Sequence, residues 1–402
     1  MRLSCAAVRW PSDDTIQSWK RRQSKPNKGK LVRVRRCATV MFAPQERVEF
    51  SFESIASGGS GLQKHTEWIA LIPHQDAETA VDAVEMEILG TISPSEWIEI
   101  DALKASHSPE AVDALLDKHL LVVEDSDADT RDRKLRARHW RPASAIMHYA
   151  SRWRGIGAKQ NNEDLSDTLG GQIADWLGPP PPPIRERVEA HVRMRLPREP
   201  ASPFENLLRQ RTTCREFDSA RKLSLAQFAA MLFRVFGARA VDEPAPGVSL
   251  LKRNVPSAGG LHPTEAYLLV QNVDGIAPGL YHYHPIDHAL EPIKAMSAEE
   301  AAATANHFVS SQSYLANAHV MVVLASRFER TFWRYRNHTK AYRALILDIG
   351  HLSQTLYLAA TELGLGAFVT AAVNEVDIEQ AFGLDPFEEG PLAVCGFGCR
   401  AG

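Results

Sequence analysis

The sequence predicts an α+β fold, in which a mixed or antiparallel sheet is flanked by helices and preceded by a smaller helical module. Two observations favour this fold. In the C-terminal half, apolar runs too short for helices, such as HVMVVLASRF (319–328), alternate with helical repeats such as SLAQFAAMLFRVFG (224–237). Upstream, GPPPPPIRERV (178–188) is a stiff proline run that cannot continue a helix, so it separates two parts of the chain.

The charge of the chain is unevenly distributed. Residues 1–37 contain 11 Lys/Arg and 2 Asp/Glu, whereas the rest of the chain contains 35 and 47, a net charge of −12. Because blocks of like charge repel, we predict a disordered basic arm over residues 1–40. A start of translation at Met41 is an alternative, because MFAPQERVEF (41–50) begins the first strand-like pattern.

The part before the proline run has the element order of a winged helix-turn-helix. Apolar spacing predicts helices over 81–92, 98–105 and 108–119, followed by a strand over 120–125. Ser108 is the expected N-cap of the third helix, and Pro109 its first helical residue.

The third of these helices argues against DNA binding. It presents Glu110, Asp113 and Asp117 against the single Lys118, and phosphate groups would repel that surface. We therefore predict a module that docks a peptide partner, rather than a nucleic-acid reader. With a charged connector (129–140) and a helix (143–153), this module is expected to span 41–178.

After a linker at 179–189, residues 190–402 are predicted to form one domain. Helices are expected at 204–210, 224–237, 297–308 and 340–366; strands at 265–273, 319–328, 367–373 and 391–398; and a hairpin at 279–293. The helix over 340–366 is apolar on nearly all sides, which predicts that it is buried, with His351 in the core.

Composition favours a reduced, cytoplasmic protein without a bound metal. There is no apolar segment of 18 residues and no secretory signal after Met1. The five cysteines, at positions 5, 37, 214, 395 and 399, form no CxxC pair.

Two short motifs in the C-terminal part suit a phosphate-bearing, flat ligand. In RQRTTCREF (209–217), Arg211, Thr213 and Arg215 alternate, so an extended segment directs them to one side, where guanidinium groups match phosphate oxygens. In SAGGLHPTE (257–265), two glycines permit close backbone approach to a ring. Taken alone, the first motif is better explained as an exposed polar linker, and the second is explained equally well as a tight turn before a strand.

Together, these motifs resemble the FMN-dependent nitroreductase fold. PSAGGLHPTEAY (256–267), GLYHYHP (279–285) and the long helix ending in GLGA resemble, more narrowly, the SagB/ThcOx-type dehydrogenases. The resemblance covers about 200–402 and implies a nitroreductase-like mixed sheet, FMN and a homodimer with FMN at its interface. It also implies oxidation of azolines to azoles in a ribosomally made precursor peptide, with other maturation enzymes as partners.

The same resemblance assigns expected roles to individual residues. Contacts to the FMN phosphate and ribityl chain are implied for Arg211, Thr213, Arg215 and Arg400. Contacts to the flavin ring are implied for Pro256, Ser257, Ala258, Gly259, Gly260 and Leu261, with Gly366 on the far side.

The catalytic residue is less well defined by sequence. Dehydrogenases of this type often carry a Lys-Tyr pair before the long helix, but here Arg334–Tyr335 stands in that place. Lys340 and Tyr342 are displaced downstream, so Tyr335, Lys340 and Tyr342 are all candidates, Tyr335 with help from a neighbouring cation. His262 is expected to be structural more often than catalytic.

Two other functions remain open at this point. One is an NAD(P)H-dependent flavin reductase of nitro, quinone or dehydroamino-acid substrates. The other is a flavin-free scaffold protein that binds a peptide.

Overall fold

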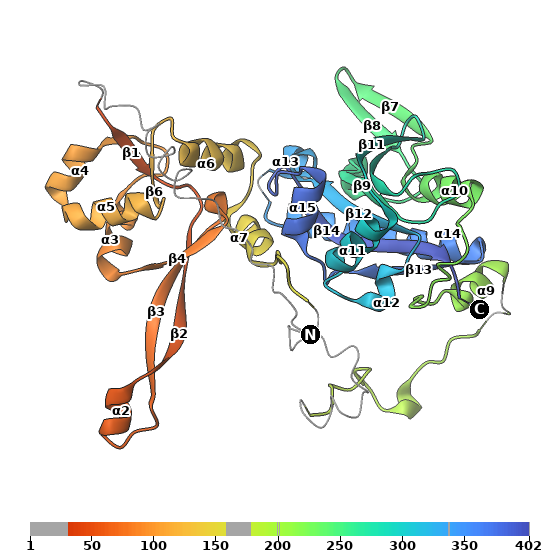
Figure 1. Ribbon diagram of the computed structural model, residues 1–402, viewed down its shortest axis with the longest axis horizontal. Coiled ribbons are helices and arrows are strands. Elements are labelled where there is room, and N and C mark those ends of the chain that lie inside the picture. Colours follow the sequence, from red (N-terminus) through yellow and green to blue (C-terminus); the bar gives the residue numbers. More distant parts are fainter. Residues whose placement is uncertain (1–30, 158–177, 199, 201, 337, 402) are drawn as a thin grey trace, which may run out of the picture. The chain divides into compact units, whose positions relative to one another are not determined.

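The computed structural model describes residues 31–157, 178–198, 200, 202–336 and 338–401 (Figure 1). The chain divides into two compact units, one ending at Asp132 and the other beginning at Arg133, a boundary within α6 (Asp127–Ala137). The first thirty residues of the predicted arm, and residues 158–177 of the predicted module over 41–178, lie outside the described residues. No helix in the described part of the chain is long and apolar enough to cross a membrane.

The first unit contains a small sheet whose central strand comes from the expected arm. Strand β1 (Arg33–Arg36) pairs antiparallel with β5 (Ile98–Glu99) and β6 (Leu121–Val123). Val34 and Cys37 are fully buried. The prediction of disorder through residue 40, and the idea that nothing before Met41 folds, are therefore wrong. The adjacent residues Val34 and Arg35 are both buried, which the high local charge of this segment concealed.

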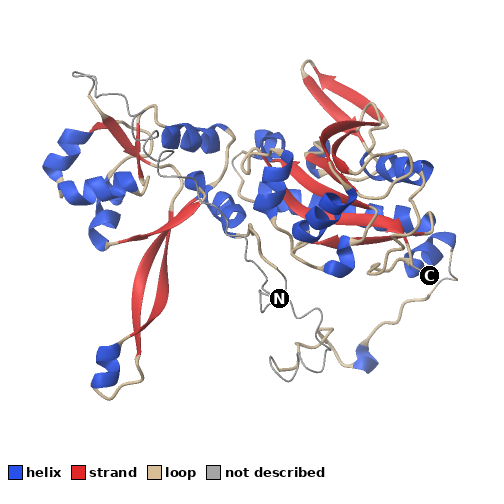
Figure 2. Ribbon diagram, viewed as in Figure 1, coloured by secondary structure: helices blue, strands red, loops and turns tan. Residues whose placement is uncertain are grey.

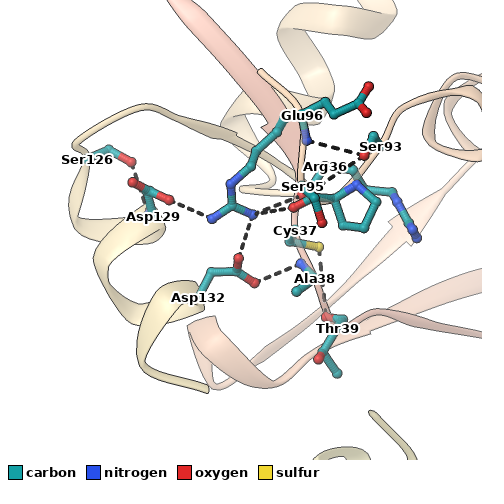
Figure 3. A network of polar contacts seen from close by, with 12 residues as sticks. Arg36, Cys37, Ala38, Thr39, Ser93, Ser95, Glu96, Ser126, Asp129 and Asp132 are labelled. Atoms are coloured by element: carbon teal, nitrogen blue, oxygen red, sulfur yellow. Dashed lines mark hydrogen bonds and ion pairs between the residues drawn. The ribbon is translucent and has the colours of Figure 1, made fainter. Parts of the chain in front are cut away.

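A buried ion-pair network holds β1 against α6 (Figure 3). The guanidinium of Arg35 donates to Asp129 Oδ1 at 2.5 Å and to Asp132 Oδ2 at 2.6 Å. The second oxygen of Asp132 accepts the backbone N–H of Ala38 at 2.8 Å. Because a buried charge is costly without a partner, these contacts explain how an arginine-rich strand occupies the centre of a sheet.

The helices of the first unit follow the predicted order. They are α3 (Ala83–Thr91), α4 (Ile100–Ser106) and α5 (Pro109–Asp117). Ser108 caps α5 by accepting the N–H of Ala111, and Pro109 is its first residue, as expected. The helix-helix-strand order agrees with the sequence, and the winged-helix assignment itself stays a prediction.

A long hairpin precedes these helices. Strands β2 (Met41–Phe50), β3 (Leu62–Ile72) and β4 (Ala77–Val81) form a sheet in that order. A short helix, α2 (Phe52–Ala56), lies at the tip of the β2–β3 hairpin (Figure 1). Within this sheet β4 is an edge strand, because it pairs with β3 alone.

The second unit is built on a six-stranded sheet, confirming the α+β class. Its order is β11-β10-β9-β12-β14-β13, and every ladder is antiparallel. Parallel pairing is limited to isolated bridges such as Thr213 to Ala367. The strands are β9 (Thr264–Val270), β10 (Gly279–His284), β11 (Ala289–Ala295), β12 (Val320–Arg327), β13 (Leu365–Thr370) and β14 (Glu389–Cys399).

Helices cover both faces of this sheet (Figure 2). Side chains of β12 alternate between two cores: Val320 and Val322 pack with α10 and α14, whereas Met321 and Val323 pack with α11, α12 and α15. The helices of the second unit are α7 (Pro142–Ala150), α9 (Pro203–Gln210), α10 (Leu225–Phe236), α11 (Ala298–Phe308), α12 (Ser313–Ala316), α13 (Phe328–Tyr335), α14 (Ala341–Glu362) and α15 (Glu375–Phe382). The unit also contains the short 3-10 turns η2 (Ala190–Val192) and η3 (Ala258–Gly260), and the first unit contains a third such turn, η1 (Pro73–Gln75).

Several boundaries differ from the sequence-based expectations. Helix α14 ends at Glu362 rather than 366, because Gly364 takes a left-handed φ of +70° and Leu365 begins β13. The predicted N-terminal part ends at 178, but residues from 133 onward belong to the second unit. Trp140, for example, packs in one core with Phe328 and Phe387. Residues 179–189 are exposed and contain no helix or strand.

The sequence did not predict the hairpin β7 (Ala240–Ala245) and β8 (Val248–Lys252), nor α13 and α15. Strand β7 contains Pro244 and charged residues, all exposed, and so lacks a strand-like apolar pattern.

Candidate functional site

Arg211, Thr213 and Arg215 lie on the extended segment that follows α9. Cys214 between them is buried, and its N–H donates to Ala367 O at 2.8 Å, which fixes the segment along β13. Thr213 Oγ1 lies 3.1 Å from the hydroxyl of Tyr357, and the Arg211 guanidinium lies 5.3 Å from the ring centre of Tyr357. As predicted from the alternation, Thr213 and Arg215 face outward while Cys214 faces the core.

Gly366 and Arg400 lie beside this segment. A Cβ on Gly366 would come within 2.4 Å of Cys214 Sγ and 3.1 Å of Arg400 Cγ, so only glycine allows the three chain segments to approach this closely. Arg400 Nε donates to Leu365 O at 3.1 Å. We call Arg211, Thr213, Arg215, Gly366 and Arg400 the arginine end. No carboxylate among the described residues pairs with its three arginines.

Residues Pro256–Leu261 form a tight turn that we call the glycine loop. Gly259 and Gly260 have left-handed φ values of +63° and +67°, which side chains rarely adopt. A Cβ on Gly260 would meet no atom within 4 Å, so this part of the backbone faces open space. A Cβ on Gly259 would lie 2.9 Å from the hydroxyl of Tyr335. The left-handed backbone explains why glycine occupies both positions. At Gly259 the nearby Tyr335 hydroxyl is a second reason, because it leaves little room for a Cβ.

Asp348 of α14 holds the glycine loop from one side. Its carboxylate accepts Ser257 Oγ–H at 2.6 Å and the N–H of Ala258 at 3.1 Å. Ser257 Oγ in turn accepts the N–H of His262 at 2.9 Å. Burial raises the pKa of Asp348, while these two hydrogen bonds oppose that rise. A buried acceptor with two donors fixes the shape of the turn.

The two histidines have different environments. His262 is buried with a left-handed φ of +45°, and burial together with Arg253 and Arg330 lowers its pKa to about 4, so it is neutral at pH 7. His351 is exposed, and its Nδ1 lies 3.2 Å from Pro256 O. The expectation that His351 lies in the core is wrong, because α14 exposes one strip of its surface.

The three catalytic candidates separate in the structure. Tyr335 is half-buried beside Gly259, with the Arg334 guanidinium 5.8 Å from its ring centre. Tyr342 is only 4% exposed, lies in an aromatic core and is hydrogen-bonded to His148 Nδ1 at 3.1 Å. We therefore remove Tyr342 from the candidates, because a substrate does not reach it. Lys340 is exposed at the N-cap of α14.

Three supporting residues were missed by sequence reasoning: Asp348, Tyr357 and Arg330. Arg330 Nε donates to Leu261 O at 2.5 Å and its NH2 group to Ser249 O at 2.8 Å. A polar residue at a buried position of an apolar helix was the available signal for Asp348. Arg330 carried no signal, because its partners are backbone carbonyls distant in sequence.

Helix α14 contacts both halves of the candidate site, the glycine loop and the arginine end. Asp348 contacts the glycine loop and Tyr357 contacts the arginine end. They are nine residues, or two and a half turns, apart, which places them about 13 Å apart along the helix and on opposite faces. Within one chain the two halves therefore form two separate surfaces, one suited to an anion and the other to a flat group.

Comparison with known proteins gives a family match over this unit. The nitroreductase family model matches residues 208–399. A putative nitroreductase of Methanocaldococcus jannaschii is 30% identical over 177 residues, which cover 44% of this chain and 82% of that protein.

Two peptide-processing proteins are also similar. The trifolitoxin-processing protein TfxB of Rhizobium leguminosarum bv. trifolii is 35% identical over 36% of this chain and 39% of its own length. The microcin B17-processing protein McbC of Escherichia coli is 28% identical over 45% of this chain and 64% of its own length. The match thus spans less than two thirds of each of these two relatives.

Among solved structures, a chain of the E. coli microcin synthetase McbBCD complex with truncated pro-MccB17 bound is similar. Its TM-score is 0.49 at 22% identity, covering 67% of this chain and 98% of that chain. The family model matches the unit that carries the arginine end and the glycine loop, and the M. jannaschii relative is matched over 82% of its own length at 30% identity; the chain therefore belongs to the nitroreductase family.

Proposed function

We propose that this protein is an FMN-dependent dehydrogenase that oxidises azoline rings to azoles in a ribosomally made peptide. Two features that both contact α14 carry the proposal: three arginines that have no carboxylate partner among the described residues, and a glycine turn whose backbone faces open space. Nitroreductase-family proteins typically bind FMN, and both halves suit that cofactor.

The residues fit the two ends of FMN. Arg211, Arg215 and Arg400 supply donors for a phosphate, and Thr213 supplies a hydroxyl at the same place. The open backbone at Gly260 allows a flat ring to approach without meeting a side chain. When bound, FMN would supply two-electron redox chemistry.

The position of the halves on opposite faces of α14 supports a homodimer. A single ligand would contact both halves if one chain supplied the arginine end and a second chain the glycine loop. The exposed strip of α14 includes Ile346 (46% exposed) and Leu347 (64% exposed). Gly350 on the same strip would allow a neighbouring helix to approach, because nothing lies within 4 Å of its Cβ position.

We assign Tyr335 the role of accepting the substrate proton. Oxidation of an azoline removes a hydride and a proton, and FMN, when bound, would supply the two-electron acceptor. Tyr335 lies against the glycine loop, where a Cβ on Gly259 would come within 2.9 Å of its hydroxyl, and the Arg334 guanidinium lies 5.8 Å from its ring centre. Reoxidation of the flavin needs an acceptor such as oxygen.

The substrate class rests on the relatives and on the first unit. TfxB and McbC are named for the processing of trifolitoxin and microcin B17. We assign the first unit to precursor docking, with other maturation enzymes as further partners. Its edge strand β4 has an unpaired side for an extended peptide, and the acidic α5 disfavours nucleic acid.

The experiment uses the purified protein, its flavin content and a synthetic peptide containing one thiazoline. We expect a yellow protein and a product lighter by two hydrogens in mass spectrometry, formed in air without NAD(P)H. Rapid flavin bleaching by NAD(P)H with no peptide oxidation would favour the reductase alternative. A colourless protein that FMN cannot reconstitute would contradict the proposal.

A further inference from the structure

A pocket of about 500 Å³ opens within the second unit, next to the glycine loop. Its walls come from the β7–β8 turn and β8, from α13, and from the start of β14. The lining residues used below are Leu250, Leu261, Arg330, Trp333, Glu388 and Glu389. The volume lies in the range of sites that enclose a small ligand or a short segment of a longer one.

The pocket is structurally joined to the glycine loop. Leu261 is the last residue of the loop and also a wall of the pocket. Arg330 fixes this wall, because it donates both to Leu261 O and to Ser249 O of β8. Trp333, which lines the pocket, precedes Tyr335 on α13 by two residues. Residues two apart on a helix point to nearly opposite sides, so the pocket is joined to the glycine loop through Leu261 and Arg330 rather than through Tyr335.

The charges of the pocket are balanced in number and its three arginines are engaged, whereas Glu389 Oε1 is buried with no hydrogen-bond partner among the described residues. Three arginines and three glutamates line it. Arg138 pairs with Glu388 at 2.6 Å and Arg327 with Glu265 at 2.9 Å, while Arg330 is bonded to the two carbonyls. A dinucleotide such as NADH would need free cations for its phosphates, and three acidic side chains would oppose it.

The remaining wall suits an uncharged, partly apolar ligand. Leu250 and Leu261 are aliphatic, and Trp333 is 49% exposed, which is a large aromatic surface left open at the pocket. A peptide segment carrying heteroaromatic rings combines apolar faces with amide groups and needs no net charge.

We propose that this pocket binds an uncharged stretch of a few residues of the substrate peptide, adjacent to the ring being oxidised. The inference rests on the proposed function, because it names where the substrate of that site is held. It assigns Trp333 and Leu250 to substrate recognition, and Arg330 to positioning of the wall.

The test measures binding rather than turnover. The probe is a fluorescein-labelled hexapeptide that contains one thiazole and otherwise uncharged residues, titrated with the protein as purified and followed by fluorescence anisotropy. We expect Trp333→Ala, which removes the aromatic wall, and Leu250→Trp, which fills the pocket, to raise Kd about tenfold or more. Phe233→Ala, which truncates a 40%-exposed aromatic outside the pocket lining, should leave Kd unchanged.

Three results would overturn the inference: no binding of the probe to the wild-type protein, equal Kd values for the two pocket variants and the wild type, or displacement of the probe by NADH. Circular dichroism of each variant separates a folding failure from a loss of binding, and the two pocket variants change the pocket in opposite directions.

Because the thiazole is already oxidised, the binding of the probe is independent of the thiazoline oxidation test. Oxidation without probe binding would overturn the pocket alone, and binding without oxidation would leave the pocket standing and contradict the proposed reaction.

Discussion

The arginine end and the glycine loop are attached to the same helix but are built in opposite ways. At the arginine end, three cations remain without a carboxylate partner among the described residues, so their donors are available to a ligand. The glycine loop is held by the protein itself, through Asp348, Arg330 and an internal bond between Ser257 and His262. The difference indicates that one half supplies electrostatic attraction and the other supplies a fixed shape.

The largest expected effect comes from removing charge at the arginine end. Arg211→Ala combined with Arg215→Ala should weaken FMN binding by about a hundredfold or more, because each charge-assisted hydrogen bond is worth about 1.5–3 kcal/mol. FMN titration followed by flavin fluorescence measures the change. The matched control is Arg221→Ala with Arg239→Ala, two exposed arginines elsewhere in the unit, and equal losses in both pairs would contradict the assignment.

The second prediction concerns the exposed strip of α14. Leu347→Glu should convert the dimer into monomers, because it places a charge in an interface that would bury this 64%-exposed leucine. Light scattering after gel filtration gives the mass. Ile286→Glu, at another exposed aliphatic residue, should remain dimeric. If Leu347→Glu stays dimeric and retains FMN, the α14 strip is not the interface.

A smaller effect is expected at Asp348, which shapes the loop without offering charge to the ligand. Asp348→Ala removes the acceptor of Ser257 and Ala258, so FMN affinity should fall about tenfold, with a faster flavin release rate. Asp348→Asn keeps one acceptor oxygen and should recover part of the loss. A shift in the flavin midpoint potential in the alanine variant would separate altered ring contacts from simple instability. Unchanged affinity and potential in both variants would show that the loop does not depend on Asp348.

The smallest effect on the site is expected at Glu375, which lies outside both halves. Burial raises its pKa from 4.5 to about 7, and it accepts the N–H of Trp153 at 2.8 Å. Because the folded state holds this proton more tightly, its contribution to stability is full below pH 4.5 and is lost as pH rises to about 7, by up to about 3 kcal/mol. Glu375→Gln should flatten urea-unfolding stability over that window without changing FMN affinity. An unchanged pH slope would contradict the assignment.

The sequence predicted these two halves to different extents. The residues that we propose to contact a ligand lie in short local motifs, so sequence alone was enough to predict roles for Arg211, Thr213, Arg215 and the Gly259–Gly260 turn. The residues that hold them, Asp348, Arg330 and Tyr357, act across long separations in sequence, which no local pattern records. Likewise, β1 was missed because Arg35 is buried only through Asp129 and Asp132, more than 90 residues away. Local periodicity predicted α5, α10 and α11 with their caps, since capping depends on neighbouring residues alone.

The central claim is that an arginine end and a glycine loop from two different chains make one flavin site. It is tested most directly by mixing two inactive variants, Arg211→Ala/Arg215→Ala and Asp348→Ala/Ala258→Trp, unfolding and refolding them together, and measuring bound FMN. If the site is shared, each mixed dimer contains about one site with both halves intact, so FMN binding returns although neither variant binds alone. No recovery of bound FMN, in mixtures shown by mass to contain mixed dimers, would contradict the account.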